Sequence, residues 1–359
     1  MKIRFFNPGL LYWKMRPEML NEIDRVLQAG DLILRADVEK FEKTLADYIG
    51  VKYAVALNSG TDALYLALRA LKIGPGDEVL VPSRTFVASA QVIVQVGATP
   101  IYYDLDGFSS MPFSDKIKAV IPVHIEGALD TQFDAVLASA QKHGWHVIED
   151  AAQALGAVYK CPDFEEGDVC ALNDKKAGSI GDVGCFSFYP AKILGAYGDA
   201  GALVTNNEEI YKYVHDCRNH FKEDARDWGV NSRMDNLQAV VLNQKFKYLP
   251  GILGRRKEIA LLYSMQLPPE IIPPSTEGRV WQDYIVRTPR RDELYEFLKS
   301  KEIETMKNNY PFPVPKMPLA QKYEDETLRL PCNELLTDAE VDEVIKNVNE
   351  FFGVNKIYV

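Results

Sequence analysis

The chain has 359 residues, of which 47% are hydrophobic, so it can bury a sizeable core and most simply forms one large and one smaller domain. Its 41 basic and 51 acidic residues give a formal net charge of −10, which disfavours binding to nucleic acid. The sequence begins without an apolar signal core and contains no apolar run long enough to span a bilayer, so we expect a cytoplasmic protein that does not bind membranes.

The first informative segment predicts a strand over 53–57 and a helix over 63–71, joined by a turn of small residues. Such a turn makes an anion site, because the backbone N–H groups of Gly60 and Thr61 would face a phosphate at the positive end of the helix. A hydroxyl from Ser59 or Thr61 would add a hydrogen bond. Ordinary helix capping explains the same pattern.

Strands and helices alternate from this point onward. We expect strands over 78–81, 100–103, 119–123 and 146–149, with helices starting near residues 85 and 131. This order predicts a mostly parallel sheet covered by helices, in which ligands bind where strand ends meet the following helices.

The strand expected over 146–149 delivers a carboxylate, Asp150, and an amide, Gln153, about one turn later if a helix begins there. An aspartate beside the ring nitrogen of pyridoxal phosphate keeps that nitrogen protonated, so the ring can accept electrons. Gln153 could bond the ring hydroxyl or pack over the ring. The alternative is that Asp150 caps the next helix.

Residues 185–188 read as an aromatic, buried strand that leads to Lys192 and then to a glycine-rich turn over 195–201. A lysine between a proline and small residues, where the backbone can approach a ligand, differs from an ordinary surface lysine. Desolvation would lower its pKa and make the amine nucleophilic, so we interpret Lys192 as a Schiff-base lysine. A lysine that snorkels from the core to the surface is the alternative.

The rest of the chain predicts helices over 236–267 and then a smaller α/β unit. That unit would contain a strand over 282–287, a helix over 291–300, a proline-marked loop (Pro311, Pro313, Pro315 and Pro318), and a final helix over 338–351 opened by Thr337. We therefore divide the chain into a large cofactor-binding domain, 1–240, and a small C-terminal domain, 241–359. The five cysteines are scattered without Cys-x-x-Cys spacing, so we predict neither a disulfide framework nor, from the scattered histidines, a metal site.

Together these segments resemble the DegT/DnrJ/EryC1/StrS sugar aminotransferase family, a group of fold type I pyridoxal-phosphate enzymes. The resemblance extends over nearly the whole chain and includes further motifs at 74–79, 82–89, 97–100, 121–124, 218–220 and 231–235. It implies an α/β fold with a large domain, in which helices cover a mostly parallel sheet, and a smaller C-terminal α/β domain.

The resemblance also implies roles for individual residues. It assigns Lys192 to the imine bond with pyridoxal phosphate, Asp150 to the ring nitrogen, and Gln153 to the ring and its hydroxyl. Phe86 matches an aromatic residue that stacks on the cofactor, although it could equally be a core residue. The phosphate cup would comprise Ser59, Gly60, Thr61 and Ser187, where Ser187 could instead be a plain strand hydroxyl.

Asn231 matches an asparagine that reaches the phosphate from the other subunit, although it could be only a turn residue. The resemblance thus implies a homodimer with shared active sites. It also implies ping-pong transfer from glutamate to a keto sugar linked to a nucleoside diphosphate, in amino-sugar and polysaccharide biosynthesis. Carbon 3 is favoured over carbon 4, because carbon-4 enzymes often have an aromatic residue where Ser232 stands.

Two other functions stay open. A sugar dehydratase with the same cofactor would have histidine in place of Lys192, and a silent regulator or scaffold would have lost Lys192 or Asp150.

Departures from the family pattern concern the substrate more than the cofactor. Glu126 stands where a tyrosine is common, and residues 308–311 lack the usual histidine before Tyr-Pro. Next to Lys192 the usual Thr-Lys-Asn-Leu-Gly reads Ala-Lys-Ile-Leu-Gly, and Ala200 replaces a glycine. The acidic stretch over 160–177 is longer than the family's hairpin, and we interpret it as a mobile flap or as a solvated loop without a role.

Overall fold

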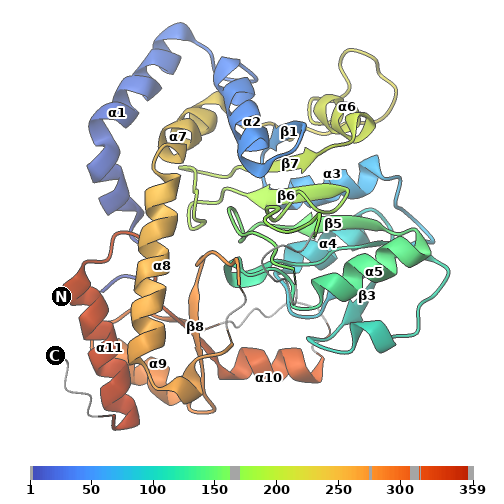
Figure 1. The fold of residues 1–359 in the computed structure, drawn as a ribbon. Coiled ribbons are helices and arrows are strands. Elements are labelled where there is room, and N and C mark those ends of the chain that lie inside the picture. The colour runs from blue at the N-terminus through green and yellow to red at the C-terminus, as the bar shows by residue number, and fades with distance from the viewer. Residues whose placement is uncertain (1–2, 162–169, 275–276, 308–314, 316, 355–359) are drawn as a thin grey trace.

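The structure is a computed structural model that describes residues 3–161, 170–274, 277–307, 315 and 317–354 (Figure 1). Its centre is a seven-stranded sheet in the order β1-β7-β6-β5-β4-β2-β3. Six of the strands run parallel, while β7 runs antiparallel to both β1 and β6. The strands are β1 (Tyr53–Leu57), β2 (Glu78–Pro82), β3 (Thr99–Tyr103), β4 (Ile117–Val120), β5 (His146–Asp150), β6 (Val183–Ser187) and β7 (Gly201–Thr205).

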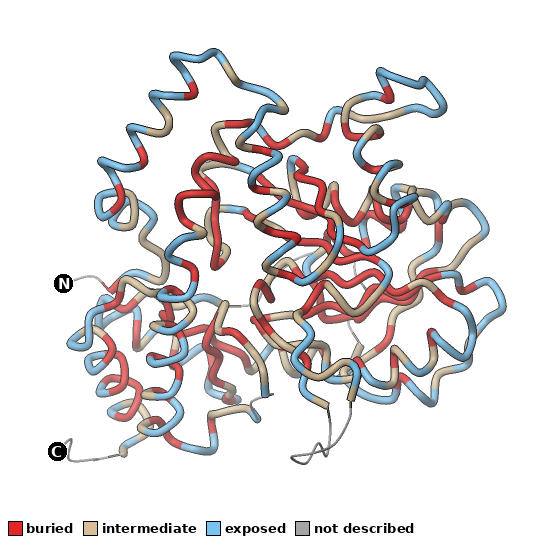
Figure 2. The backbone as a smooth tube through the Cα atoms, turned by 45° about the horizontal axis from the view of Figure 1, so that its top comes forward, coloured by how far each residue is buried: buried red, intermediate tan, exposed pale blue. Residues whose placement is uncertain are grey.

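Helices cover both faces of this sheet, as the sequence predicts. On one face, apolar side chains of α3 (Gly60–Ala70), α4 (Val87–Gln95) and α6 (Glu208–Cys217) pack on alternate strand residues such as Val55 and Leu203. On the other face lie α2 (Ala36–Ile49), α5 (Phe133–His143) and α7 (Asn236–Phe246). Figure 2 shows buried residues concentrated along the strands between these layers.

The C-terminal part forms a second, smaller α/β layer. A three-stranded antiparallel sheet has the order β8-β10-β9 and comprises β8 (Tyr284–Arg287), β9 (Met306–Lys307) and β10 (Thr327–Leu330). Its core includes residues of α8 (Leu249–Gln266), α9 (Arg291–Ser300) and α11 (Asp338–Phe352). Figure 1 shows α8 running from the large sheet to this unit.

The domain boundary at 240/241 is not tested by the structure. We propose that it lies slightly later in the chain, within α8. Residue 240 lies inside α7, whose Leu242 packs with the large core, while Ile252 at the start of α8 belongs to the large core and Ile259 to the small one.

Several elements differ from the sequence prediction. Helices α1 (Pro8–Ala29), α2, α6 and α10 (Pro318–Glu326) and strands β7 and β10 were not foreseen. Pro318 does not mark a loop but begins α10, because the first helical position needs no N–H donor. No helix follows Asp150; turns do.

A disulfide joins Cys161 to Cys170, so the prediction of a chain without disulfides was wrong. The two arms of the 157–177 hairpin pair through Val158 and Lys176, which brings the two cysteines together although no Cys-x-x-Cys motif announces it. The acidic residues over 162–169 lie outside the described residues, as does the 308–311 motif. Within the described ranges, no helix is long and apolar enough to cross a membrane.

Candidate active site

A cavity of about 530 Å³ opens where the parallel strands of the large sheet end. Eight of the nine candidate residues line it: Ser59, Gly60, Thr61, Phe86, Asp150, Gln153, Ser187 and Lys192. Asn231 does not; it is exposed and lines a separate hollow beside Asp62 and Tyr65. One chain therefore brings together every predicted site residue except the one expected to serve the other subunit.

The start of α3 forms the end of the cavity at which the sequence predicts an anion site. Ser59 caps this helix, since its Oγ accepts a hydrogen bond from the backbone N–H of Asp62 at 3.0 Å. The N–H groups of Gly60 and Thr61 lie in the first turn of α3, where no earlier turn of the helix supplies a carbonyl acceptor. A β-carbon on Gly60 would lie 3.0 Å from Cβ of Ser187, so glycine lets the helix start pack tightly against the end of β6.

Asp150 is the last residue of β5 and is buried. Its Oδ2 accepts a hydrogen bond from Ser89 Oγ at 2.6 Å, and its Oδ1 accepts one from the N–H of Ala152 at 3.2 Å. Helix capping is excluded as its role, because no helix follows. The adjacent Glu149 points the other way and accepts hydrogen bonds from three backbone N–H groups over 178–181, which fixes the end of the strand.

Gln153 is held by a backbone contact rather than by a helix. Its Oε1 accepts a hydrogen bond from the N–H of Glu126 at 2.8 Å, which leaves its amide nitrogen as the group that can donate toward a ligand. Glu126 is itself buried, adopts φ +57°, and forms an ion pair with Arg84.

Phe86 is 45% exposed and precedes α4 at the rim of the cavity, so it is not a core residue. An aromatic side chain that lines a cavity can stack on a planar ligand. Ser187 ends β6, and its Oγ accepts a hydrogen bond from the N–H of Tyr189 at 3.3 Å.

Lys192 lines the cavity from the loop that follows β6, so it does not snorkel to the outer surface. Burial lowers the pKa of its amine, while the charges of Asp150 and Asp283 oppose that shift. The amine and the Asp150 carboxylate therefore interact electrostatically across one enclosed space.

Sequence reasoning missed three polar residues that reach this cavity from the C-terminal part of the chain. Gln282 bonds the backbone on both sides of Lys192: its Oε1 accepts from the N–H of Ile193, and its Nε2 donates to the carbonyl of Ala191, both at 3.0 Å. Asp283 and Arg329 line the cavity as a buried ion pair, 3.2 Å apart. The sequence signal available for them was the polar pair Gln282 and Asp283 at the start of the strand predicted over 282–287.

Comparison with known proteins gives a consistent result. Residues 14–349 match the model of the DegT/DnrJ/EryC1/StrS aminotransferase family. A UDP-N-acetyl-3-dehydro-alpha-D-glucosamine 3-aminotransferase of Acidithiobacillus ferrooxidans is 38% identical over 83% of this chain and 81% of its own. A pleiotropic regulatory protein of Geobacillus stearothermophilus is 34% identical over 95% of this chain and 96% of its own.

Solved structures agree. The crystal structure of DesV from S. venezuelae, in complex with a ketimine intermediate, superposes with a TM-score of 0.88 at 34% identity and covers 99% of this chain and 100% of that one. NtdA of Bacillus subtilis with bound cofactor PMP superposes with a TM-score of 0.84 at 27% identity, covering 99% of this chain and 86% of that one.

Proposed function

Because the chain belongs to the DegT/DnrJ/EryC1/StrS aminotransferase family, we propose that it is a pyridoxal-phosphate-dependent aminotransferase that converts a nucleotide-linked 3-keto sugar to the amino sugar, with glutamate as donor. The observation that carries the proposal is the shared cavity of Lys192, Asp150 and the start of α3. The 3-amino chemistry in the name of the Acidithiobacillus relative supports carbon 3. Ser232 in place of an aromatic residue also favours it.

The residues of the cavity fit pyridoxal phosphate. The free N–H groups of Gly60 and Thr61 would receive the phosphate, with Ser59 and Ser187 beside them. The ring of Phe86, which lines the cavity, would stack on the pyridine. When bound, the cofactor supplies an electron sink for the carbanion formed at the substrate carbon.

The chain's own groups would handle the protons. A lowered pKa gives Lys192 a larger neutral fraction near neutral pH, and the neutral amine is the form that bonds a carbonyl carbon and later moves a proton. Asp150, held by Ser89 and Ala152, would keep the ring nitrogen protonated. Gln153 would orient the ring through its amide nitrogen.

We further propose a homodimer in which Asn231 completes the site of the neighbouring subunit. Asn231 is exposed and lies outside the cavity of its own chain. Large apolar side chains support an interface, because Trp13 is 65% and Trp228 is 88% exposed.

A silent regulator is the second candidate, which the name of the Geobacillus relative favours. The presence of Lys192 and Asp150 in one cavity favours the enzyme over this candidate and over the dehydratase, since each alternative would lack one of these groups.

The deciding experiment is the visible absorbance of the purified protein reconstituted with pyridoxal phosphate. We expect a yellow protein that glutamate bleaches, and covalent labelling on borohydride reduction. Lys192→Ala should lose the label altogether, whereas Lys222→Ala, which removes an exposed lysine, should keep it. Labelling that survives in Lys192→Ala would refute the lysine assignment. Retention of colour without any response to glutamate, or to other amino donors, would favour the regulator.

A further inference from the structure

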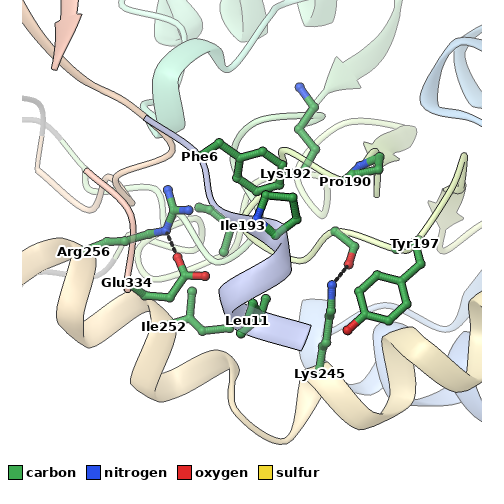
Figure 3. A pocket seen from close by; sticks show the side chains of 13 residues that line it. Phe6, Leu11, Pro190, Lys192, Ile193, Tyr197, Lys245, Ile252, Arg256 and Glu334 are labelled. Atoms are coloured by element: carbon green, nitrogen blue, oxygen red, sulfur yellow. Dashed lines mark hydrogen bonds and ion pairs between the residues drawn. The ribbon is translucent and has the colours of Figure 1, made fainter. Parts of the chain in front are cut away.

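A second cavity, of about 220 Å³, lies behind the loop that carries Lys192 (Figure 3). We call it the rear chamber; its walls include Leu11, Ile193, Tyr197, Lys245, Arg256 and Glu334. Figure 3 shows the Lys192 side chain leading away from the chamber, while Lys245 rises into it from α7. Lys192 lines both the rear chamber and the active-site cavity, so its loop lies between the two.

Lys245 is the unusual group in the rear chamber. Its side chain is buried, with 4% exposed, and its Nζ donates a hydrogen bond to the carbonyl of Gly195 at 2.6 Å. The Nζ also lies 4.2 Å from the centre of the Tyr197 ring. An ammonium carries three donors, and Gly195 is the one hydrogen-bond acceptor that the described residues give it.

A second polar group at the chamber is the hydroxyl of Tyr197. The hydroxyl of Tyr197 is buried and makes no hydrogen bond within the part of the chain that the structure describes. Buried polar groups are usually paired, and an unpaired one commonly marks a bound water or ion. Both groups can donate, so both call for an acceptor in the chamber.

The charge balance indicates an acceptor that is negative. Arg256 and Glu334 neutralise each other at 2.9 Å, and the Lys192 amine lies on the other side of the loop, so the charge of Lys245 is left over. Burial lowers the pKa of Lys245 to about 8, although Glu334 opposes the shift. A buried cation in this position either loses its proton or gains a counter-ion.

We propose that the rear chamber binds a small oxyanion, a carboxylate or a phosphate, through the ammonium of Lys245. The chamber is several times larger than the share of one water, about 30 Å³, so a small oxyanion fits. A bound anion keeps Lys245 protonated, and protonated Lys245 donates to Gly195, three residues beyond Lys192. Occupancy therefore steadies the loop that holds the catalytic amine. The anion site does not depend on the proposed function, whereas the effect of the anion on Lys192 rests on that function.

The test is equilibrium dialysis of the cofactor-loaded full chain against labelled inorganic phosphate and, separately, acetate. Loading fills the phosphate cup at α3, so the dialysis reports other sites. We expect one anion per chain, bound about tenfold or more weakly in Lys245→Met, since a hydrogen bond to a charged group is lost. Lys247→Met removes an exposed lysine directly after the end of the same helix and should bind as the unchanged chain does. The arm that binds identifies the anion.

Two results would overturn the proposal: no bound anion in either arm, or equal binding by Lys245→Met. Should Lys245→Met fail to fold, Leu11→Trp decides, because it fills the chamber and leaves Lys245 in place. Unchanged anion binding by Leu11→Trp would place the anion elsewhere. Failure of the proposed function would instead appear as absence of cofactor labelling at Lys192. An anion that then binds at the start of α3 would bind equally to Lys245→Met, so the loss of one anion in that variant still reports the rear chamber.

Discussion

Among single residues, Glu126 holds the most constrained position beside the active site. Its carboxylate pairs with Arg84, whose guanidinium lies 4.0 Å from the centre of the Tyr323 ring. Arg279 donates a hydrogen bond to the backbone carbonyl of Glu126 at 2.8 Å, and the backbone N–H of Glu126 donates one to Gln153. These contacts explain how a non-glycine residue keeps a left-handed conformation here, and why a family tyrosine can be replaced by an acid.

Glu126→Gln should leave Arg84 buried without its counter-charge and lower the free energy of unfolding by about 3–5 kcal/mol, measured by urea denaturation. The double variant Arg84→Met/Glu126→Leu should lose less than the sum of the two single variants, because no lone charge stays buried. A Glu126→Gln protein as stable as the original would show that the pair contributes nothing.

Residues at strand ends were predictable, and residues brought from afar were not. Ser59, Asp150 and Lys192 follow short apolar strands, so their meeting at one edge follows from the alternation of elements. Gln282 reaches the Lys192 loop across 89 residues of chain, and nothing in its local sequence indicates that contact. The turn after Asp150 was misread because a small-residue run also suits a helix.

Among the elements, the loop from Pro190 to Tyr197 decides where the Lys192 amine lies. Side chains hold its backbone at several points: Gln282 beside Lys192, Lys245 at Gly195, and Gln238, whose Oε1 accepts from the N–H of Tyr197 at 2.9 Å. A β-carbon on Gly195 would lie 2.3 Å from the Pro190 carbonyl, so the loop closes tightly on itself.

We expect Gln282→Leu to slow the half-reaction with glutamate about 10- to 100-fold, because two hydrogen bonds that fix Lys192 are lost. Stopped-flow absorbance of the cofactor measures this rate. The matched control, Gln238→Leu, removes a contact five residues beyond Lys192 and should slow the reaction less. If both variants lose equal activity, the effect of Gln282 is general loosening of the loop. Unchanged kinetics in Gln282→Leu would remove its positioning role.

The parallel part of the large sheet was predictable from its alternation of strands and helices, but β7 was not. Its five residues follow a glycine-rich turn that reads as loop, and its antiparallel direction depends on pairing with the preceding strand β6 and with β1, which lies far away in sequence. Helix α1 escaped prediction because few of its residues are buried, so its apolar spacing is weak.

At the scale of the whole molecule, the shared-site dimer makes a sharp prediction. Lys192→Ala and Asn231→Ala chains should each be inactive or weakly active at limiting cofactor. A hybrid of the two, co-expressed and isolated by different tags, has one site with both residues intact and should recover about half of the original rate per dimer. A hybrid no more active than its parents would mean that Asn231 serves its own chain or none.

The supports of the lysine loop come from residues 238, 245 and 282, all later in the chain than Lys192 itself. During synthesis, Lys192 therefore leaves the ribosome before the three side chains that hold its loop. A nascent chain that has made Lys192 but not these residues lacks the contacts that hold the loop. A truncated chain that ends before residue 282 would carry Lys192 without the two hydrogen bonds from Gln282. The loop around Lys192 can therefore gain all three supports only after residue 282 has been synthesised.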